Sequence, residues 1–443
     1  MAFFVIYIFA PMISINALYE LYLKHPDICT DSRKLKSGDL FFALRGGNFN
    51  GNQFAARAIS EGAAYAVIDE EPEIPNDRYL LVPDVLSCLQ KLAGHHRNQF
   101  SIPFIGITGS NGKTTTKELI HAVLSTAYRT YTTEGNLNNH IGIPLTLLKI
   151  KPDAEIAIIE MGANHLREIA GYCEYARPIH GIITNCGKAH LEGFGSIEGV
   201  RKGKGELYDW LRAHGGTAFV MWDYDYLQEM SKGIPEIVSY GTADASVTGI
   251  ADPGNEDKAH LRVKLTHGVN INIIQTRLTG RYNLPNVLAA VTVGNFFKTD
   301  PAKIKKGIEE YEPTNSRSQV IKKESNTIVL DAYNANPSSM KLAIENFAGL
   351  PSKDKVLVLG AMAELGKASL TEHAEILEQI AGHPWKEVLL VGGDLLKIKH
   401  NYRSFSTSAE AGAWLKTRRF KNTWFLVKGS RSVGMEKILI DGL

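Results

Sequence analysis

Apolar and polar positions along the chain follow two patterns, one typical of buried strands and the other of amphipathic helices. Near the start, short apolar runs predict strands at residues 39–44, 65–69 and 79–83, and residues 52–63 read as a helix between the first two. A second helix is expected over residues 85–100. The beginning of the chain is therefore predicted to form a small α/β unit.

The next segment repeats this alternation around a glycine-rich turn. The buried run 102–108 precedes the turn, and a helical pattern over residues 115–128 follows it. Two more apolar strands end at Glu160 and Asn185. Strands that alternate with helices predict a mainly parallel sheet, in which ligands collect at the carboxyl ends of the strands. We therefore expect the glycine-rich turn, Glu160 and Asn185 to share one crevice.

Between residues 217 and 280 the pattern changes to alternating β sequence. Two short strands flank a Thr-His-Gly turn, and the alternation places six apolar side chains on one face of a hairpin. These residues are Leu261, Val263, Leu265, Val269, Ile271 and Ile273. We expect antiparallel strands that extend the central sheet.

After Pro313 a third α/β pattern begins, with strands and helices in a Rossmann-like order. The expected strands are 327–333, 355–362, 387–393 and 423–429, and the expected helices are 338–349, 371–381 and 408–418. A chain of 443 residues exceeds what one core usually organises, which predicts two or three domains, and the three patterns together favour three α/β domains. They are a small N-terminal unit (12–100), a central domain with a mainly parallel sheet and an antiparallel extension (101–313), and a C-terminal Rossmann-like domain (314–443).

Composition excludes some classes of protein. The hydrophobic fraction of 44% is ordinary for a soluble globular chain, and no 18-residue apolar run predicts a membrane span. Lys plus Arg total 49 against 47 Asp plus Glu, which argues against a nucleic-acid-binding surface. The four scattered cysteines form neither a CxxC pair nor a disulfide framework. A reducing cytoplasm is the expected location.

The first eleven residues, Met1 to Pro11, are apolar. They lack the basic region and the cleavage site of a secretory signal, so we do not expect export. Translation that begins at Met12, where a polar periodic segment starts, is an open alternative.

The sharpest chemical signal is the turn GITGSNGKT (106–114), which lies between a predicted strand and a predicted helix. Glycines let the backbone wrap an oxyanion, the helix N-terminus offers unpaired N–H groups, and Lys113 supplies positive charge. The Thr114 hydroxyl can bind Mg²⁺. Ile107 occupies the position of the first glycine in the usual phosphate-loop pattern, and a glycine turn that binds nothing is the plain alternative.

The segment TGSNGKTT (108–115) resembles the shortened phosphate loop of the Mur ligase family, and the resemblance covers nearly the whole chain. Further similar segments are GNLNNHIGIP (135–144), EMGA (160–163), TNCGKAHLE (184–192), DAYNANP (331–337) and KGSR (428–431). The resemblance implies an ATP-dependent, magnesium-requiring amide ligase of peptidoglycan precursor synthesis.

The resemblance also implies an ATP site assembled from several segments. The loop residues expected at the phosphates are Gly109, Ser110, Asn111, Gly112, Lys113, Thr114 and Thr115. Asn283 and Asn286 are expected near the adenine, and Arg317 and Asp331 near phosphate and ribose. Taken alone, the two asparagines are equally well helix caps, Arg317 a surface arginine and Asp331 a strand-end carboxylate.

Two Mg²⁺ ions are implied, one on Thr114 and one on Glu160 and His190. A carboxylate is a usual magnesium ligand, whereas imidazole is a less usual one. Without the resemblance, Glu160 reads as a solvated charge or helix cap and His190 as a structural histidine. Asn136 is expected to order the same region and to contact substrate.

The implied substrates are small molecules. The N-terminal segment TDSR (30–33) resembles the family's UDP-sugar-binding unit, so Asp31, Ser32 and Arg33 are expected to contact a UDP-N-acetylmuramoyl tripeptide. The YNANP segment favours the branch of the family that adds D-alanyl-D-alanine. Nucleic acid is not expected as a partner, and we expect a monomer.

Lys204 falls where several Mur ligases carry a lysine converted by CO₂ to a carbamate. Two nearby Mg²⁺ ions would favour such an anion. A solvated position at a helix start is the alternative. The implied catalytic residues are Lys113, His190 and Lys204, acting on an acyl phosphate that forms with release of ADP and is then attacked by the amine of the dipeptide.

Three other functions stay open at this point. One is a sibling ligase that adds a diamino acid or glutamate, although the Asp-Asn-Pro-Arg signature of the diamino-acid branch is absent. A second is the related folylpolyglutamate synthase. The third is a phosphate-loop switch without ligase activity. The three predicted domains and the N-terminal unit that resembles a UDP-sugar-binding unit argue against this alternative.

Overall fold

The computed structural model describes residues 12–254, 259–314 and 316–441. The expectations about Met1 to Pro11 concern residues outside this part of the chain. The described residues form two compact units. The first contains residues up to 104 together with 131–161 and 170–178, and the second contains 105–130, 162–169 and the chain from 179 onward.

The first unit is built on a parallel sheet of order β1-β2-β5-β6, with strands β1 (Ile28–Cys29), β2 (Leu40–Phe42), β5 (Tyr65–Ile68) and β6 (Tyr79–Leu81). Its buried apolar side chains meet those of α2 (Ala55–Ser60). The other elements of this part of the chain are α1 (Ile15–Lys24), β3 (Arg45–Gly46), β4 (Phe49–Asn50), α3 (Val85–Arg97), β8 (Thr130–Thr132), α5 (Gly142–Leu148), β9 (Ile156–Glu160) and α6 (Glu168–Ala176). The predicted small α/β unit is confirmed.

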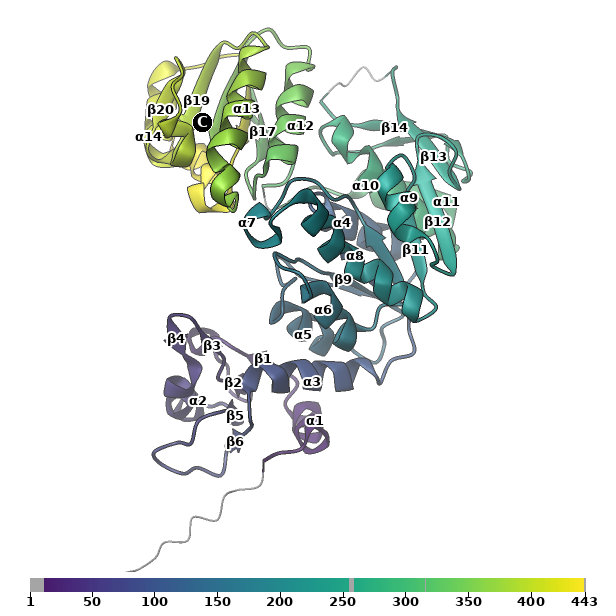
Figure 1. The fold of residues 1–443 in the computed structure, drawn as a ribbon, viewed down its shortest axis with the longest axis vertical. Helices are drawn as coiled ribbons and strands as arrows, with labels where there is room; N and C mark the ends of the chain where they lie inside the picture. The colour runs from purple at the N-terminus through teal and green to yellow at the C-terminus, as the bar shows by residue number, and fades with distance from the viewer. Residues whose placement is uncertain (1–11, 255–258, 315, 442–443) are drawn as a thin grey trace, which may run out of the picture. The chain divides into compact units, whose positions relative to one another are not determined.

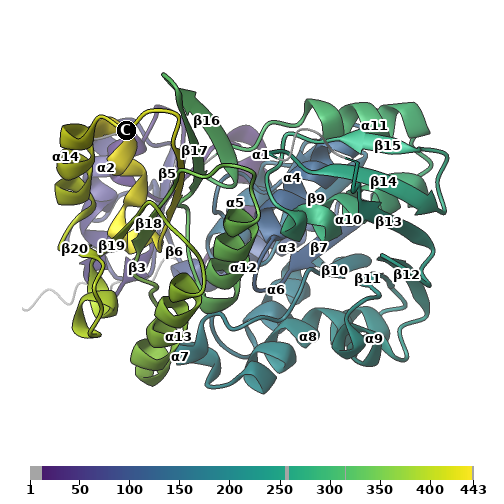
Figure 2. The ribbon, with the colours of Figure 1, turned by 90° about the horizontal axis from the view of Figure 1, so that it is seen from above.

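In the second unit, parallel strands β7, β10, β11, β12 and β13 lie side by side. Their bounds are Phe104–Thr108, His180–Ile183, Thr217–Met221, Glu236–Gly241 and Val247–Ala251. Helices α8 (Ile197–Ala213) and α9 (Asp225–Ser231) lie on one side of them, and α4 (Lys113–Leu124), α10 (Leu284–Phe296) and α11 (Pro301–Glu310) on the other (Figure 2). A short helix, α7 (Leu191–Phe194), follows β10.

The predicted antiparallel extension is present, but the expected face of its hairpin is wrong in one strand. Strand β14 (Arg262–His267) pairs antiparallel with β13 and with β15 (Ile273–Gln275), and Val263 stands opposite Ile274. Ile274 is fully buried, whereas Ile273 is half-buried. The backbone bond from Leu265 N to Asn272 O closes an irregular turn, which shifts the alternation by one residue.

The helix after the glycine-rich turn is shorter than predicted. It ends at Leu124 instead of continuing to residue 128. The Thr126 hydroxyl donates to Val123 O at 2.7 Å, and the backbone N–H groups of Ala127 and Tyr128 both donate to Leu124 O. Such local side-chain bonds compete with continued helix.

The C-terminal sheet has the order β16-β17-β21-β18-β19-β20, in which only the pair β16 and β17 is antiparallel. The strands are β16 (Gln319–Lys323), β17 (Asn326–Asp331), β18 (Lys355–Gly360), β19 (Glu387–Val391), β20 (Arg403–Phe405) and β21 (Trp424–Lys428). Helices α12 (Pro337–Ala348) and α13 (Ser369–Ala381) cover one face, and α14 (Ser408–Arg418) and α15 (Ile438–Asp441) cover the other (Figure 1). The predicted Rossmann-like layering is confirmed.

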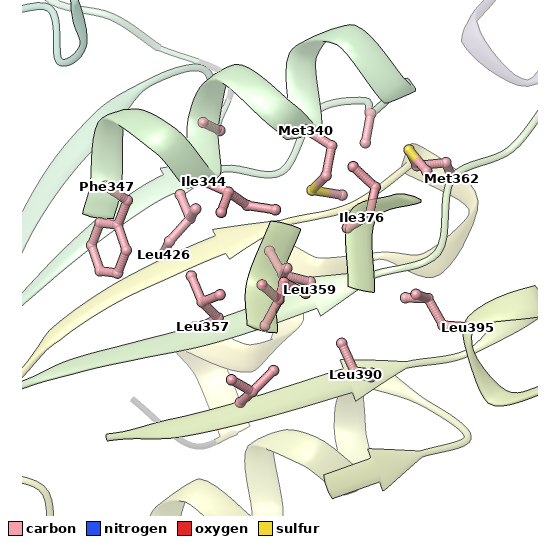
Figure 3. Packing of buried hydrophobic residues seen from close by; sticks show 14 of the residues in the cluster. Met340, Ile344, Phe347, Leu357, Leu359, Met362, Ile376, Leu390, Leu395 and Leu426 are labelled. Atoms are coloured by element: carbon pink, nitrogen blue, oxygen red, sulfur yellow. The ribbon is translucent and has the colours of Figure 1, made fainter. Parts of the chain in front are cut away.

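The core beneath α12 and α13 shows why this layering forms. Met340, Ile344 and Phe347 point from α12 onto the sheet, where they meet Leu357 and other strand side chains (Figure 3). Positions 340, 344 and 347 recur at helical spacing, so one stripe of α12 is buried. Within the described residues, no helix is long and apolar enough to cross a membrane.

Candidate active site

The glycine-rich loop joins β7 to α4 with two glycines in left-handed backbone conformations. Gly109 has φ +140° and Gly112 has φ +80°. A Cβ atom on Gly109 would lie 2.0 Å from Thr184 Oγ1, and one on Gly112 would lie 2.6 Å from Asn286 Oδ1. Only glycine fits at both positions. The Lys113 ammonium donates to Gly109 O at 2.6 Å and to Ser110 O at 3.2 Å, so its charge lies over the loop.

The end of β10 holds this loop in place. Asn111 N donates to Asn185 Oδ1 at 3.1 Å, and the Thr184 hydroxyl donates to Asn111 O at 2.6 Å. The Ser110 hydroxyl donates to Gly187 O at 2.9 Å. The prediction that the glycine-rich turn and Asn185 meet is confirmed.

Asn283 and Asn286 connect α10 to α4. Asn286 Nδ2 donates to Asn283 Oδ1 at 2.8 Å, and the Thr116 hydroxyl donates to Asn286 Oδ1 at 3.1 Å. Asn283 Nδ2 donates to Thr279 O at 2.7 Å and makes no helix-capping bond, so the capping alternative is wrong for Asn283. Both side chains are buried beside the loop.

His190 and its loop contact the segment after β18. His190 has φ +52°, and its Nδ1 lies 2.6 Å from Glu364 Oε2. The contact with the His190 imidazole lowers the pKa of the Glu364 carboxyl, and the positive charge of Lys113 contributes further. Glu192 N also donates to Glu364 O at 3.3 Å. Because Nδ1 faces Glu364, Nε2 is the ring nitrogen left to bind a ligand.

The same loop makes further contacts with the C-terminal α/β layer. Lys188 Nζ lies 2.6 Å from Glu372 Oε1 on α13, and Lys188 N donates to Ser338 Oγ on α12 at 3.0 Å. Asn336 Nδ2 donates to Asn111 Oδ1 at 2.7 Å. Residues of the central and C-terminal sheets thus meet directly at the phosphate loop.

Lys204 is fully buried on α8, so the alternative of a solvated charge is wrong. Its ammonium donates to Ala163 O at 2.8 Å and lies 5.1 Å from the centroid of the Phe194 ring. No carboxylate of the described residues forms an ion pair with it. Burial, helped by the positive charge of Lys113, lowers the pKa of Lys204 to about 7.

In the first unit, Glu160 ends β9 as a buried carboxylate. Asn138 Nδ2 donates to its Oε1 at 2.7 Å, and Glu160 N donates to Thr133 Oγ1 at 3.0 Å. Glu160 Oε2 is buried and has no hydrogen-bond donor within the described residues. Asn136, the predicted neighbour, is exposed, and Asn138 makes the contact instead. Whether Glu160 shares a crevice with the loop stays a prediction.

Asp331 and Lys428 end the neighbouring strands β17 and β21 and pair with each other. Lys428 Nζ lies 2.5 Å from Asp331 Oδ2, and Ser318 N donates to Asp331 Oδ1 at 3.3 Å. The Arg317 guanidinium carbon lies 3.5 Å from the centroid of the Tyr333 ring. Arg317 and Asp331 therefore lie at one end of the C-terminal sheet.

Asp31, Ser32 and Arg33 form a short turn in the first unit. Arg33 Nε and Nη2 each donate to the Asp31 carboxylate at 2.8 Å, and this pairing lowers the pKa of Asp31 to about 2. The Asp31 side chain also accepts from Arg33 N and caps the turn. Arg33 is exposed, whereas Asp31 and Ser32 are half-buried.

Three family models match successive parts of the chain. Residues 27–97 match the Mur ligase family catalytic domain, 107–294 the Mur ligase middle domain, and 316–431 the Mur ligase glutamate ligase domain. The UDP-N-acetylmuramoyl-tripeptide--D-alanyl-D-alanine ligase of Bacillus subtilis is 34% identical over 96% of this chain and 94% of its own length.

The chain belongs to the Mur ligase family.

Solved Mur ligases agree with the fold. MurF from Acinetobacter baumannii has a TM-score of 0.86 at 31% identity and covers 94% of this chain and 92% of its own. The MurF ligase from Thermotoga maritima in complex with ADP has a TM-score of 0.85 at 26% identity and covers 94% and 97%. The predicted α/β fold, the family and the ligase class are confirmed.

The sequence left some residues of this Mur ligase unassigned. Asn138 lies two residues after Asn136 in a segment that is rich in asparagine. The sequence pattern could not show which of the two contacts Glu160. Glu364 and Lys188 were missed because their partners lie far along the chain. Tyr333 and Arg431 lie in segments that resemble the family, but neither residue had been assigned a role. Hydrophobic periodicity gives no information about them.

Proposed function

We propose that this Mur ligase joins D-alanyl-D-alanine to a UDP-N-acetylmuramoyl tripeptide in an ATP-dependent reaction that yields ADP and phosphate. The observation that carries the proposal is end-to-end similarity to ligases named for this reaction, combined with a fully formed phosphate loop. Peptidoglycan precursor synthesis in the cytoplasm is the setting we infer from those names, and a monomer is the form we expect.

ATP is needed because a carboxylate is a poor acyl donor. Transfer of the γ-phosphoryl group to the tripeptide carboxylate gives an acyl phosphate, and attack by the dipeptide amine then releases phosphate. In this scheme the loop N–H groups from Gly109 to Thr115 bind the phosphates, and Lys113 neutralises their charge. The buried pair Asn283 and Asn286 lies beside the loop and is suited to the adenine edge. Asp331 and Arg317 would serve ribose and phosphate.

Magnesium fits the residues assigned to it. Glu160 offers a buried carboxylate oxygen that has no other partner within the described chain, and Thr114 offers a buried hydroxyl at the start of α4. Nε2 of His190 is the imidazole atom turned away from Glu364. When bound, Mg²⁺ would offset the charge of the phosphates. The described residues hold no cluster of three or more His, Cys, Asp or Glu, so substrate and water oxygens would complete the coordination.

We infer that Lys204 becomes a carbamate. A neutral amine is needed to attack CO₂, and a pKa near 7 supplies one at physiological pH. The nitrogen forms a bond to the carbon of CO₂ and loses one proton to solvent, which leaves an N-linked carboxylate. This step changes a buried neutral amine into an anion that could face Mg²⁺.

The remaining proposed substrate contacts are based on the resemblance to the family. Asp31, Ser32 and Arg33 would bind the UDP part of the acceptor, and Asn136 would contact its peptide. We infer domain boundaries near residues 101 and 314, which agree with the gaps between the three matched segments.

The direct test is a product assay. Purified protein is incubated with UDP-N-acetylmuramoyl tripeptide, ATP, Mg²⁺ and either D-alanyl-D-alanine, a diamino acid or glutamate. We expect mass spectrometry to show product only with the dipeptide, with a mass gain of one dipeptide less one water, and equal amounts of ADP and phosphate. Product with a single amino acid, or ATP hydrolysis without product, would contradict the proposal.

Lys113→Ala is the matched inactive variant for this assay. Loss of a cation that stabilises the transition state costs about 3–4 kcal/mol, so turnover at saturating ATP should fall by about 10²–10³-fold. Because the side chain contacts loop carbonyls and not the apolar core, circular dichroism should be unchanged. Near-normal turnover would remove Lys113 from the mechanism.

A further inference from the structure

Two arginines share one aromatic ring near the end of the C-terminal sheet. The guanidinium carbon of Arg317 lies 3.5 Å from the centroid of the Tyr333 ring, and that of Arg431 lies 5.5 Å from the same centroid. Both side chains carry a guanidinium cation. Both cations lie against the same ring, and an anion bound beside them would offset their positive charge.

The protein itself supplies little compensating charge. The Asp331 carboxylate accepts from the backbone N–H of Ser318, the residue after Arg317, at 3.3 Å, and Lys428 already lies 2.5 Å from this carboxylate. Arg431 forms no ion pair with any described residue. Arg317 Nε is buried and has no hydrogen-bond acceptor within the described part of the chain. The cluster therefore has an excess of positive charge and donors that await an acceptor.

The backbone that carries Arg431 is fixed. The Ser430 hydroxyl donates to Ala361 O at 2.6 Å, and Ser430 N donates to the same oxygen at 3.1 Å. A Cβ atom on Gly429 would lie 2.7 Å from Met435 Cγ, so this residue packs too closely for a side chain. Arg431 is exposed, yet it projects from a rigid support. Such preorganisation favours binding of a small ligand.

The cluster is connected to the reaction site through Tyr333. This tyrosine lies three residues before Asn336, whose side chain donates to Asn111 of the phosphate loop at 2.7 Å. Strands β17, β18 and β21 are parallel and end at this edge of the sheet, the edge at which α/β sheets bind ligands.

We propose that Arg431, supported by Tyr333, binds the C-terminal carboxylate of the D-alanyl-D-alanine substrate. This inference rests on the proposed function. The phosphates of ATP have the loop N–H groups and Lys113, whereas the dipeptide carboxylate has no cation assigned to it so far. A guanidinium group matches a carboxylate with two parallel hydrogen bonds. Arg431 thereby orients the dipeptide so that its amine faces the activated acceptor.

The test compares two amines, D-alanyl-D-alanine and its C-terminal amide, with wild type and Arg431→Met. In wild type the acid should be preferred. In Arg431→Met the KM for the acid should rise by about 30-fold or more, as expected for loss of a charge-assisted bidentate contact, while the KM for ATP stays unchanged. The preference for acid over amide should disappear. Arg431→Lys should give a smaller rise, because it keeps charge but loses the bidentate geometry.

Arg418→Met is the matched control. Arg418 is exposed in the same α/β layer, and its guanidinium carbon lies 5.1 Å from the centroid of the Trp414 ring. Its kinetics should equal wild type. If Arg431→Met instead raises the KM for ATP, or weakens acid and amide equally, the proposal is overturned. If the wild-type protein forms no product with the dipeptide, the proposed function is wrong. That result is distinct from a failure of the Arg431 assignment. Should Arg431→Met fail to fold, the acid-to-amide ratio of Arg431→Lys decides.

Discussion

Lys204 on α8 and Lys428 at the end of β21 are both buried almost completely, and the protein treats their charges in opposite ways. Lys428 has a carboxylate partner, Asp331, at 2.5 Å. Among the described residues, Lys204 has a neutral acceptor, Ala163 O at 2.8 Å, and no carboxylate partner, and burial lowers its pKa to about 7. An ion pair satisfies a buried charge, whereas a buried amine without one tends to lose its proton.

The comparison separates a lysine held in an ion pair from one whose amine we propose to react. The Lys428 pair fixes the ends of two strands. Lys204 is held in a state in which the amine can react, at the cost of a less stable charged form. Burial alone therefore does not identify a functional lysine, and the partner of the buried nitrogen is the informative observation.

The largest effect is expected from Lys204→Ala. If Lys204 acts as a carbamate, this variant should lose most activity, about 10³-fold, because an anion that helps to position the metal is removed. Acetate added at high concentration should restore part of the rate by standing in for the carbamate oxygens. Rates measured with and without acetate check both statements.

Lys202→Ala is the matched control for this experiment. Lys202 lies two residues away on the same helix and is exposed, so its variant should keep wild-type activity and ignore acetate. Wild-type turnover by Lys204→Ala in CO₂-depleted buffer would show that Lys204 takes no part in catalysis.

A smaller effect, this time on stability, is expected from Lys428→Met. Removing one partner leaves the Asp331 carboxylate poorly compensated in a mostly buried site, which should cost about 3 kcal/mol of unfolding free energy. The urea midpoint of the C-terminal transition reports it. Lys204→Met, which removes a buried amine without a carboxylate partner, should not destabilise its own transition.

The double variant Lys428→Met/Asp331→Asn sharpens the contrast. Because it removes both charges, it should recover much of the stability that Lys428→Met loses. Equal losses in Lys204→Met and Lys428→Met would mean that the partner of the nitrogen makes no difference.

The smallest effect is a pH dependence caused by Lys204. In the unfolded chain a lysine titrates near its ordinary value of about 10.4, whereas in the folded protein Lys204 titrates at about 7. Between these values the unfolded state binds more protons, so this residue makes stability rise with pH, with a slope of at most about 1.4 kcal/mol per pH unit. Urea unfolding from pH 7 to 9 in CO₂-depleted buffer measures it, and Lys204→Met should lack this contribution. An identical slope in both proteins would contradict the lowered pKa.

Much of this molecule follows from its sequence because the relevant signals are local. The strand, turn and helix around Lys113 are encoded within a short stretch of apolar and glycine residues, and the structure has them where predicted. The predicted end of α4 and the predicted register of β15 were wrong. A threonine hydroxyl sets where the helix ends, and an irregular turn sets the register of the strand. Periodicity carries no information about such details.

The site was less accessible to sequence reasoning wherever a contact joins distant segments. Glu364 lies beside His190, and Lys188 pairs with Glu372, across long stretches of chain. A single sequence contains no signal for such pairs. Lys204 was predicted to be functional only from the family resemblance. The basic residues around it suggested a solvated helix start, whereas the side chain is buried.

The four cysteines of the chain, Cys29, Cys88, Cys173 and Cys186, are all buried, and none forms a disulfide within the described residues. Cys186 follows the strand end that holds the phosphate loop, and burial raises the pKa of its thiol to about 12. Thiolate is the reactive form, so alkylating and oxidising reagents should react slowly with the folded protein. A pair of cysteines introduced at exposed positions of α8 and α13 would consequently take fluorescent labels selectively. Single-molecule energy transfer between them would then report how often the contact between Lys188 and Glu372 opens during turnover.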